Sequence, residues 1–371
     1  MAQSLANKVI GEAQVVVIGA GVIGCSVAYH LARRGASVSV IEANGIATGT
    51  SSATLGLVWV QRKEPAEYME LNLLSSKLHA ELAGTFDEDV ELSQPGGMAT
   101  YLDESIFRTQ LAVMDRLNSA SEKHQARALS PREARELEPA LSLDIVGGIY
   151  CPHDGEINPI RLVFNLAFGA KKFGASFLTH TPVLRITQDE AGVTGVDTQT
   201  GFYRAWTVVV AAGLGTAALM ETAGINVPMA FERGQILVTE AMRRVMIYPS
   251  GNTRQTGRGN ILLGTTYESN CNERLATADG ARKIAGHALR RYPALNDIQI
   301  VRHFAGIRPL PKDGKPYLGA VERVPGLFVA TSHSGITLAP VHGKVISELI
   351  LDGHTDVPIG IYQPERYTPE L

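Results

Sequence analysis

The stretch Val15-Val16-Val17-Ile18-Gly19-Ala20-Gly21-Val22-Ile23-Gly24, near the start of the 371-residue chain, decides the fold. Its four consecutive β-branched residues predict a strand buried in a parallel sheet. In the G-x-G-x-x-G pattern, Gly19 permits a tight turn, Gly21 lets backbone N–H groups approach a pyrophosphate, and Gly24 allows close helix–strand packing. The following helix offers unpaired N–H groups and a partial positive charge to a phosphate. The stretch therefore predicts a dinucleotide-binding unit.

The residues that follow complete a βαβ unit. A helical apolar pattern over residues 25–34 stops at Gly35, a predicted C-cap, and residues 37–41 predict the second parallel strand. Glu42 ends this strand at the spacing expected of a carboxylate that bonds ribose hydroxyls. NAD and FAD sites share this unit, so it does not by itself separate the two cofactors.

Composition narrows the class of protein. The length suggests two domains, and 45% hydrophobic with 19% charged residues is ordinary for a soluble enzyme. A net charge of −3 gives no basis for nucleic-acid binding. The three cysteines never form a C-x-x-C pattern and the histidines lack ligand spacing, so we expect no disulfide framework and no metal. Few cysteines and no signal peptide favour the cytoplasm, because the apolar stretch 15–32 is better explained by the βαβ unit.

Further strand and helix signals place nucleotide-type elements at the start, middle and end of the chain. Residues 207–212 and 327–331 predict buried strands, and residues 340–351 predict a helix with Pro340 in its first turn. Between them lie short strands at 183–187, 193–197 and 202–205, a helix starting at Asn158-Pro159, a strand-rich block at 234–240, 260–267 and 298–304, and a helix near 279–291.

These signals predict an α/β fold with a discontinuous Rossmann-type domain and an inserted α+β substrate domain built on an antiparallel sheet. The expected cofactor domain comprises residues 13–80, 149–228 and 306–357, and the expected substrate and interface domain comprises residues 81–148 and 229–305.

Several motifs occur in a characteristic order. After the opening unit come the small-residue loop 49–56, the strand Val208-Val209-Val210-Ala211-Ala212-Gly213, and Arg233-Gly234-Gln235. The stretches Ala305-Gly306-Ile307-Arg308-Pro309, Asp313-Gly314-Lys315-Pro316 and Gly326-Leu327-Phe328-Val329-Ala330-Thr331-Ser332-His333-Ser334-Gly335 close the series. Over nearly its whole length the chain resembles the D-amino-acid-oxidase-like family of FAD enzymes, which includes glycine oxidase and the sarcosine oxidases.

The resemblance implies FAD, bound noncovalently, because the chain has neither the cysteine nor the early-loop histidine that attach flavin in some relatives. Backbone N–H groups at the Gly335 turn and a helix start at residues 337–340 would face the negative charge of reduced flavin. His333 is expected to contact flavin rather than act as an acid or base. The full set of expected cofactor residues is Gly19, Gly21, Gly24, Glu42, Thr50, Ser51, Ser52, Gly56, Val183, Ala212, Gly213, Gly306, His333, Gly335, Ile336 and Thr337.

Two arginines are the expected substrate residues. Arg308 carries a forked guanidinium that suits a carboxylate, and the resemblance implies that it holds the substrate carboxylate. Arg254 lies in the strand block expected to cover the flavin, where it is either a second polar contact or a surface residue.

The resemblance implies hydride transfer from the C–N bond of an amino acid to flavin N5. The chain looks most like the small flavoprotein subunits of heteromeric opine oxidases and of D-hydroxyproline dehydrogenase, which implies a larger partner subunit and leaves room for FMN at a subunit interface. D-proline or D-hydroxyproline dehydrogenation, glycine or sarcosine oxidation, an NAD-dependent dehydrogenase and a noncatalytic FAD-binding subunit remain alternatives.

Overall fold

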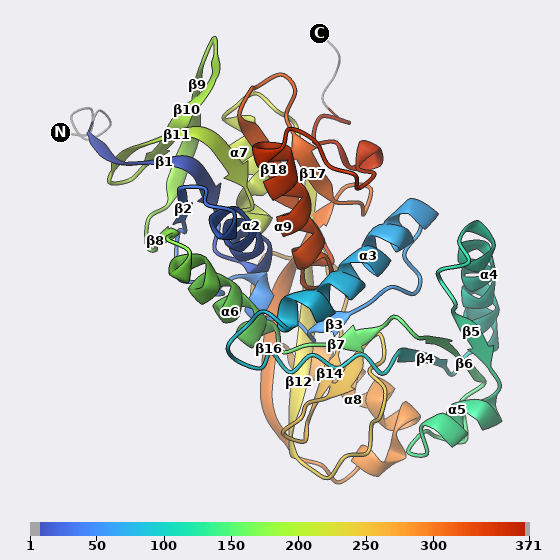
Figure 1. The fold of residues 1–371 in the computed structure, drawn as a ribbon. Coiled ribbons are helices and arrows are strands. Elements are labelled where there is room, and N and C mark those ends of the chain that lie inside the picture. Colours follow the sequence, from blue (N-terminus) through green and yellow to red (C-terminus); the bar gives the residue numbers. More distant parts are fainter. Residues whose placement is uncertain (1–7, 368–371) are drawn as a thin grey trace.

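The computed structural model describes residues 8–367 and builds them on an eight-stranded sheet (Figure 1). Its central strands are parallel and come from distant parts of the chain, as predicted from the buried β-branched runs. Strand β17 (Tyr317–Ala320) runs antiparallel at one edge. The remaining strands in order are β18 (Leu327–Thr331), β11 (Gly201–Val210), β1 (Val9–Ile18), β2 (Val38–Ile41) and β8 (Ser176–Leu178), with β10 (Gly192–Thr198) and β9 (Val183–Asp189) attached to β11.

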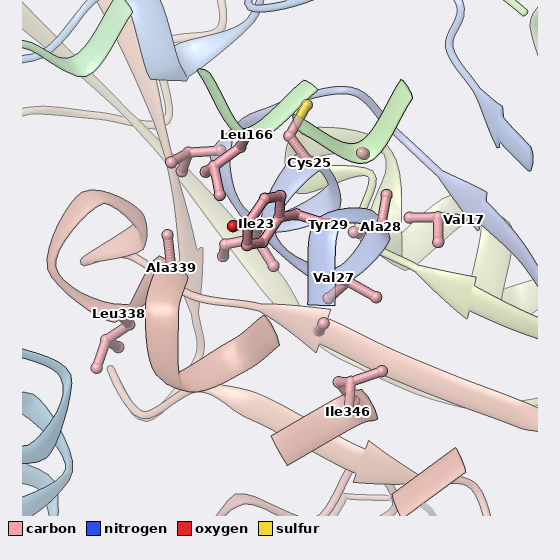
Figure 2. Close-up of a cluster of buried hydrophobic side chains, with 14 of the residues drawn as sticks. Val17, Ile23, Cys25, Val27, Ala28, Tyr29, Leu166, Leu338, Ala339 and Ile346 are labelled. Carbon is pink, nitrogen blue, oxygen red and sulfur yellow. The ribbon is translucent and has the colours of Figure 1, made fainter. Parts of the chain in front are cut away.

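Three helices pack together against the parallel sheet. Helix α2 (Val22–Arg33) contacts both α6 (Pro159–Lys172) and α9 (Gly335–Leu351). Figure 2 shows Ile23 and Tyr29 of α2 beside Leu166 of α6, in a cluster that also includes Ala339 and Ile346 of α9. Ten of the twelve residues of α2 are buried, so the helix that follows the glycine motif is held from every side. Helix α3 (Ala66–Ala83) packs on α9.

A second, antiparallel sheet confirms the predicted substrate-domain architecture. Its strands β12 and β16 pair over most of their lengths, and β14 pairs with β12 on the other side. The members are β12 (Met229–Ala241), β13 (Thr253–Gln255), β14 (Asn260–Gly264), β15 (Glu268–Ser269) and β16 (Ile300–Pro311), beside α8 (Ala278–Arg291). The other elements are β3 (Leu57–Val58), β4 (Gly97–Tyr101), α4 (Glu104–Ala120), β5 (Arg127–Leu129), α5 (Pro131–Leu137), β6 (Gly147–Cys151), β7 (Gly155–Glu156) and α7 (Thr216–Glu221).

Several predicted element bounds differ from the structure. The separate strands predicted at 202–205 and 207–212 are one strand, β11, which pairs with β1 along its length. The opening strand begins at Val9, six residues before the β-branched run. Strand β16 crosses the boundary predicted between residues 305 and 306, so Gly306 and Arg308 belong to the antiparallel sheet.

The closing helix also begins earlier than predicted. Helix α9 starts at Gly335, which places Pro340 inside the helix rather than in its first turn. A proline has no N–H to donate to the carbonyl four residues earlier, here that of Ile336. The Nε2 group of His79 lies 2.9 Å from this carbonyl oxygen and 3.1 Å from that of Thr337. The helix therefore continues through Pro340 because a histidine from α3 supplies the missing donor.

We predict that His79→Leu destabilises the protein by about 1–3 kcal/mol, because it leaves a buried carbonyl without its donor. His79→Gln should cost less, since an amide N–H can replace the donor. Urea unfolding measures both values. Equal losses in the two variants would contradict this role.

The stability of the protein depends on pH through His79. Burial lowers the pKa of His79 to about 4, whereas the unfolded chain gains a proton near the ordinary value of 6.5. The unfolded state therefore binds more protons between these values, and His79 makes the protein about 2 kcal/mol less stable at pH 5 than at pH 7. His79→Gln should remove this part of the pH dependence.

Candidate functional site

A cavity of about 1060 Å³ opens where the carboxyl ends of the parallel strands meet the antiparallel sheet. Its walls include the residues that follow β1, β2, β11 and β18, together with the 48–63 segment and parts of β12 and β16. In open α/β sheets, ligands bind beyond the carboxyl ends of the strands. The expected cofactor residues on this wall are Gly19, Gly21, Glu42, Thr50, Ser51, Val183, Ala212, Gly213, Gly306, His333, Gly335, Ile336 and Thr337.

The glycine motif has the geometry that its sequence predicts. Gly19 has a φ of +107°, in the region that favours glycine. A Cβ on Gly24 would lie 2.0 Å from the Gly19 carbonyl oxygen, so only glycine lets α2 approach the turn. Gly24 is not part of the cavity wall and acts through packing. The Val22 N–H donates to Ser51 Oγ at 3.0 Å, which ties the start of α2 to the small-residue loop.

Glu42 braces the turns around the cavity. Its Oε2 accepts the Ala20 N–H at 2.8 Å and its Oε1 accepts the Asn44 N–H at 2.8 Å. A carboxylate oxygen has two lone pairs, so each can still accept a ligand hydroxyl. This arrangement is compatible with the predicted ribose contact.

The small-residue loop connects the two sheets. Thr50 Oγ1 donates to the Ile307 carbonyl in β16 at 2.6 Å. Ser52 and Gly56 do not line the cavity, although we expected both to contact the cofactor. Ser52 Oγ bonds the Gly49 carbonyl, and a Cβ on Gly56 would lie 2.3 Å from the Ile157 carbonyl oxygen. Both residues shape the loop from behind.

The closing turn brings α9 to the cavity. Thr337 Oγ1 accepts the Trp59 N–H at 3.0 Å, so the first turn of α9 also holds the 57–59 segment. Desolvation in the cavity, together with the positive charges of Lys63 and Arg308, lowers the pKa of His333 to about 3. His333 is therefore neutral at pH 7, in agreement with a contact role rather than an acid or base role.

These residues fit an FAD molecule. The cavity is large enough for a cofactor, and it combines a helix start behind Gly21, a carboxylate at Glu42 and exposed backbone at Gly213 and Gly335. A Cβ on Gly213 would meet nothing within 4 Å, so this backbone faces open space.

The family model described as FAD dependent oxidoreductase (DAO) matches residues 14–349. The chain belongs to this family. A subunit of the opine oxidase of Agrobacterium tumefaciens (strain Ach5) is 29% identical over 364 residues, which cover 96% of this chain and 98% of the relative. Its counterpart from Rhizobium meliloti is 30% identical over 368 residues, with the same coverage. The crystal structure of glycine oxidase from Geobacillus kaustophilus superposes with a TM-score of 0.91 at 26% identity, covering 97% of this chain and 100% of that one.

Membership in the FAD dependent oxidoreductase family identifies the cofactor as FAD and removes the NAD-dependent alternative. Within residues 8–367, no group of three or more histidine, cysteine or acidic side chains could hold a metal ion. No helix in this part of the chain is long and apolar enough to span a membrane.

Arg308 lies on the cavity wall, as the sequence predicts, but its guanidinium already has partners. Nη1 donates to Glu232 Oε1 at 2.7 Å, Nη2 donates to Thr265 Oγ1 at 2.6 Å, and both nitrogens donate to the Thr266 carbonyl oxygen at 3.1 Å. The guanidinium passes over Gly234, where a Cβ would lie 2.2 Å from Nη2. This contact explains the glycine of Arg233-Gly234-Gln235. Glu232 faces Arg308 across β12 and β16 and orients it.

The structure does not bring Arg254 to the cavity. Its side chain is 5% exposed, its Nε donates to the Leu55 carbonyl, and its Nη1 lies 3.9 Å from Glu156 Oε2. Arg254 is absent from the cavity wall, whereas Leu55 is part of it. The expectation of a substrate contact or a surface position is therefore corrected: Arg254 holds the backbone of a wall residue from behind.

Three cations on the wall, Arg62, Lys63 and Arg274, were not predicted. Arg62 and Lys63 line the cavity together with His333 and Ser334. In the sequence they belong to a polar run that ends at Glu64 and precedes a helix, a pattern typical of a solvated helix start. The available signal was the position of Arg62 and Lys63, six and seven residues after the small-residue loop.

We predict that acid precipitation releases all FAD into the supernatant. Among the described residues, the cavity wall contains no cysteine and a single histidine, His333, so few groups could attach flavin covalently. Absorbance of the supernatant and the pellet measures the outcome. Flavin that stays in the wild-type pellet but leaves the pellet of His333→Ala would show a covalent bond and contradict the prediction.

Proposed function

We propose that this protein oxidises the C–N bond of a secondary amino acid such as an opine, giving an imine that water hydrolyses to an amino acid and a keto acid. The observation that carries this proposal is the Arg308 guanidinium on the wall of the FAD cavity. The similarity to the two opine oxidase subunits, over nearly the whole of each chain, supports the choice of substrate class.

Bound FAD supplies a two-electron acceptor that takes a hydride at N5. The protein's task is to present the carbon that loses this hydride. Arg308 can bind the adjacent carboxylate through its guanidinium, whose N–H groups the carboxylate then shares with Glu232, Thr265 and the Thr266 carbonyl. Glu232 and Thr265 fix the guanidinium plane before substrate arrives, which lowers the entropic cost of orientation.

The neighbouring side chains favour the uncharged amine that hydride loss requires. His333 is neutral at pH 7, and the cations Arg62 and Lys63 lie on the same wall. An ammonium would be repelled by Arg308 and Lys63, whereas a neutral amine flanked by carboxylates would be accepted. The amine proton leaves to solvent as the C=N bond forms, and water then adds to the imine carbon.

A simpler substrate remains the second candidate. The high structural similarity to a glycine oxidase supports oxidation of glycine or sarcosine, and D-proline or D-hydroxyproline would make the same single-carboxylate contact. A noncatalytic FAD-binding role is the alternative from another class of protein.

We further propose a larger partner subunit, with the cytoplasm as the site of action. The support is that both opine oxidase relatives are named as subunits and match this chain end to end. FMN at the interface with that partner is part of the same proposal.

We expect anaerobic addition of an opine to bleach the flavin absorbance faster than sarcosine, glycine or D-proline at equal concentration. The measurement is made on the isolated chain and on the complex formed with a co-expressed partner. Faster bleaching by sarcosine in both preparations would exclude the opine assignment. Absence of bleaching by every amino acid in both preparations would favour the noncatalytic role.

We expect Arg308→Lys to retain FAD but to lower kcat/KM by more than tenfold, because a lysine cannot form the two-pronged contact with a carboxylate. Arg132→Lys is the matched control, since Arg132 pairs with Glu136 on the exposed face of α5 and does not line the cavity. A change in kcat/KM of less than threefold for Arg308→Lys would show that Arg308 does not bind the carboxylate.

A further inference from the structure

The proposed substrate class demands a second cationic group, and Arg254, the second arginine expected at the substrate, does not lie on the cavity wall. An N-carboxyalkyl amino acid carries two carboxylates that flank its amine, and burying a dianion requires a positive partner for each charge. Arg254 does not line the cavity. The cations that do are Arg62, Lys63, Arg274 and Arg308.

Arg274 lies at the cofactor end of this cavity. Its Nη1 donates to the Thr48 carbonyl at 3.0 Å, beside the turn that Glu42 braces. The charge of Arg308 is largely balanced by Glu232 at 2.7 Å. The net positive charge near the closing turn therefore comes from Arg62 and Lys63.

Lys63 has no carboxylate partner within hydrogen-bonding distance in the described part of the chain. Its Nζ donates to Ser334 Oγ at 2.6 Å and lies 5.6 Å from the centre of the Tyr68 ring. Ser334 directly precedes α9, so the ammonium lies at the turn that we expect to face the flavin. Burial and the charge of Arg62 lower the pKa of Lys63 to about 8, which is the behaviour of an ammonium that lacks a counter-anion.

The nearby carboxylate of Asp154 is bonded to amide groups and forms no ion pair with Arg62 or Lys63. Asp154 accepts hydrogen bonds from the backbone N–H groups of Val60 and Gln61 and from Gln61 Nε2. These hydrogen bonds fix the backbone that directly precedes Arg62 and Lys63, and they use both carboxylate oxygens of Asp154. Asp154 positions Lys63 without forming an ion pair with it.

Arg62 occupies the rim of the same site. It is exposed, and a Cβ on Gly251 would lie 2.6 Å from its Nη2. Its φ of +63° is unusual for a side chain other than glycine. This backbone conformation places two consecutive cations, Arg62 and Lys63, on one cavity wall.

The positive charges of Lys63 and Arg308 both lower the pKa of His333, which lies on the same cavity wall. A substrate with its amine near His333 can therefore direct one carboxylate towards each cation. A substrate with a single carboxylate uses Arg308 and leaves Lys63 without an anion.

We propose that Lys63, assisted by Arg62 at the rim, binds the second carboxylate of a dicarboxylate substrate while Arg308 binds the carboxylate next to the oxidised carbon. This subsite rests on the proposed function, because it names how the substrate class is selected. It makes Lys63 the residue that distinguishes dicarboxylates from simple amino acids.

The test uses two thioethers that have no amine to oxidise. Thiodiacetate carries two carboxylates and (methylthio)acetate carries one, and each is titrated into FAD-loaded protein while the flavin absorbance is recorded. Lys63→Met should raise the Kd of thiodiacetate at least tenfold and that of (methylthio)acetate less than threefold. Lys63→Arg should stay within threefold of wild type for both.

Lys77→Met is the matched control, because it removes an exposed lysine of α3 that does not line the cavity. It should bind both probes as wild type does. The ratio of the two Kd values is measured on the flavin-loaded fraction, so reduced FAD content in a variant does not obscure it. Arg62→Ala at the exposed rim should change this ratio in the same direction, by a smaller factor.

An unchanged ratio in Lys63→Met, whether both probes weaken equally or neither does, would overturn the subsite. Failure of the proposed function is a separate result, because wild type would then bind thiodiacetate tightly without oxidising any opine.

Discussion

The close contact between Gly24 and the Gly19 carbonyl is the constraint on which the rest of the structure depends. A single methyl group on Gly24 would lie 2.0 Å from that oxygen. Because the contact is possible, α2 starts directly beyond β1 and buries ten of its twelve residues against its neighbours. The packing of α6 and α9 follows from the position of α2, and so does the direction of its N-terminus towards the cavity. Cofactor binding and core packing are thus set by the same few atoms.

Hydrogen bonds between remote segments hold the cavity open. Thr50 joins the small-residue loop to β16, Thr337 joins α9 to the 57–59 segment, and Arg254 supports Leu55 from behind. Each bond links residues at least 199 positions apart in the chain. The wall is therefore a product of the complete fold. Arg254, expected at the substrate, is better understood as part of this scaffold.

The sequence predicted the structure best where a feature depends only on residues close to it in the chain. The roles of Gly19, Gly21 and Gly24 follow from spacing and backbone conformation, and the buried strands follow from β-branched runs. It was least informative where a partner lies far along the chain. Pro340 predicts a helix start, and nothing near it shows that His79 repairs the helix. Arg254 and Lys63 are both cations near the expected site, yet only the packing decides that Lys63 lines the cavity and that Arg254 does not.

Strand β16 contacts the small-residue loop through Gly306 and the cavity through Arg308, only two positions further along the strand. A Cβ on Gly306 would lie 2.7 Å from Ala53 in the small-residue loop, and Arg308 lies on the cavity wall. An extended strand is stiff over such a short distance, so any shift of the loop is transmitted to the arginine. The small-residue loop and the arginine therefore form one mechanical unit, so a substitution that displaces Ala53 would be expected to displace Arg308 as well.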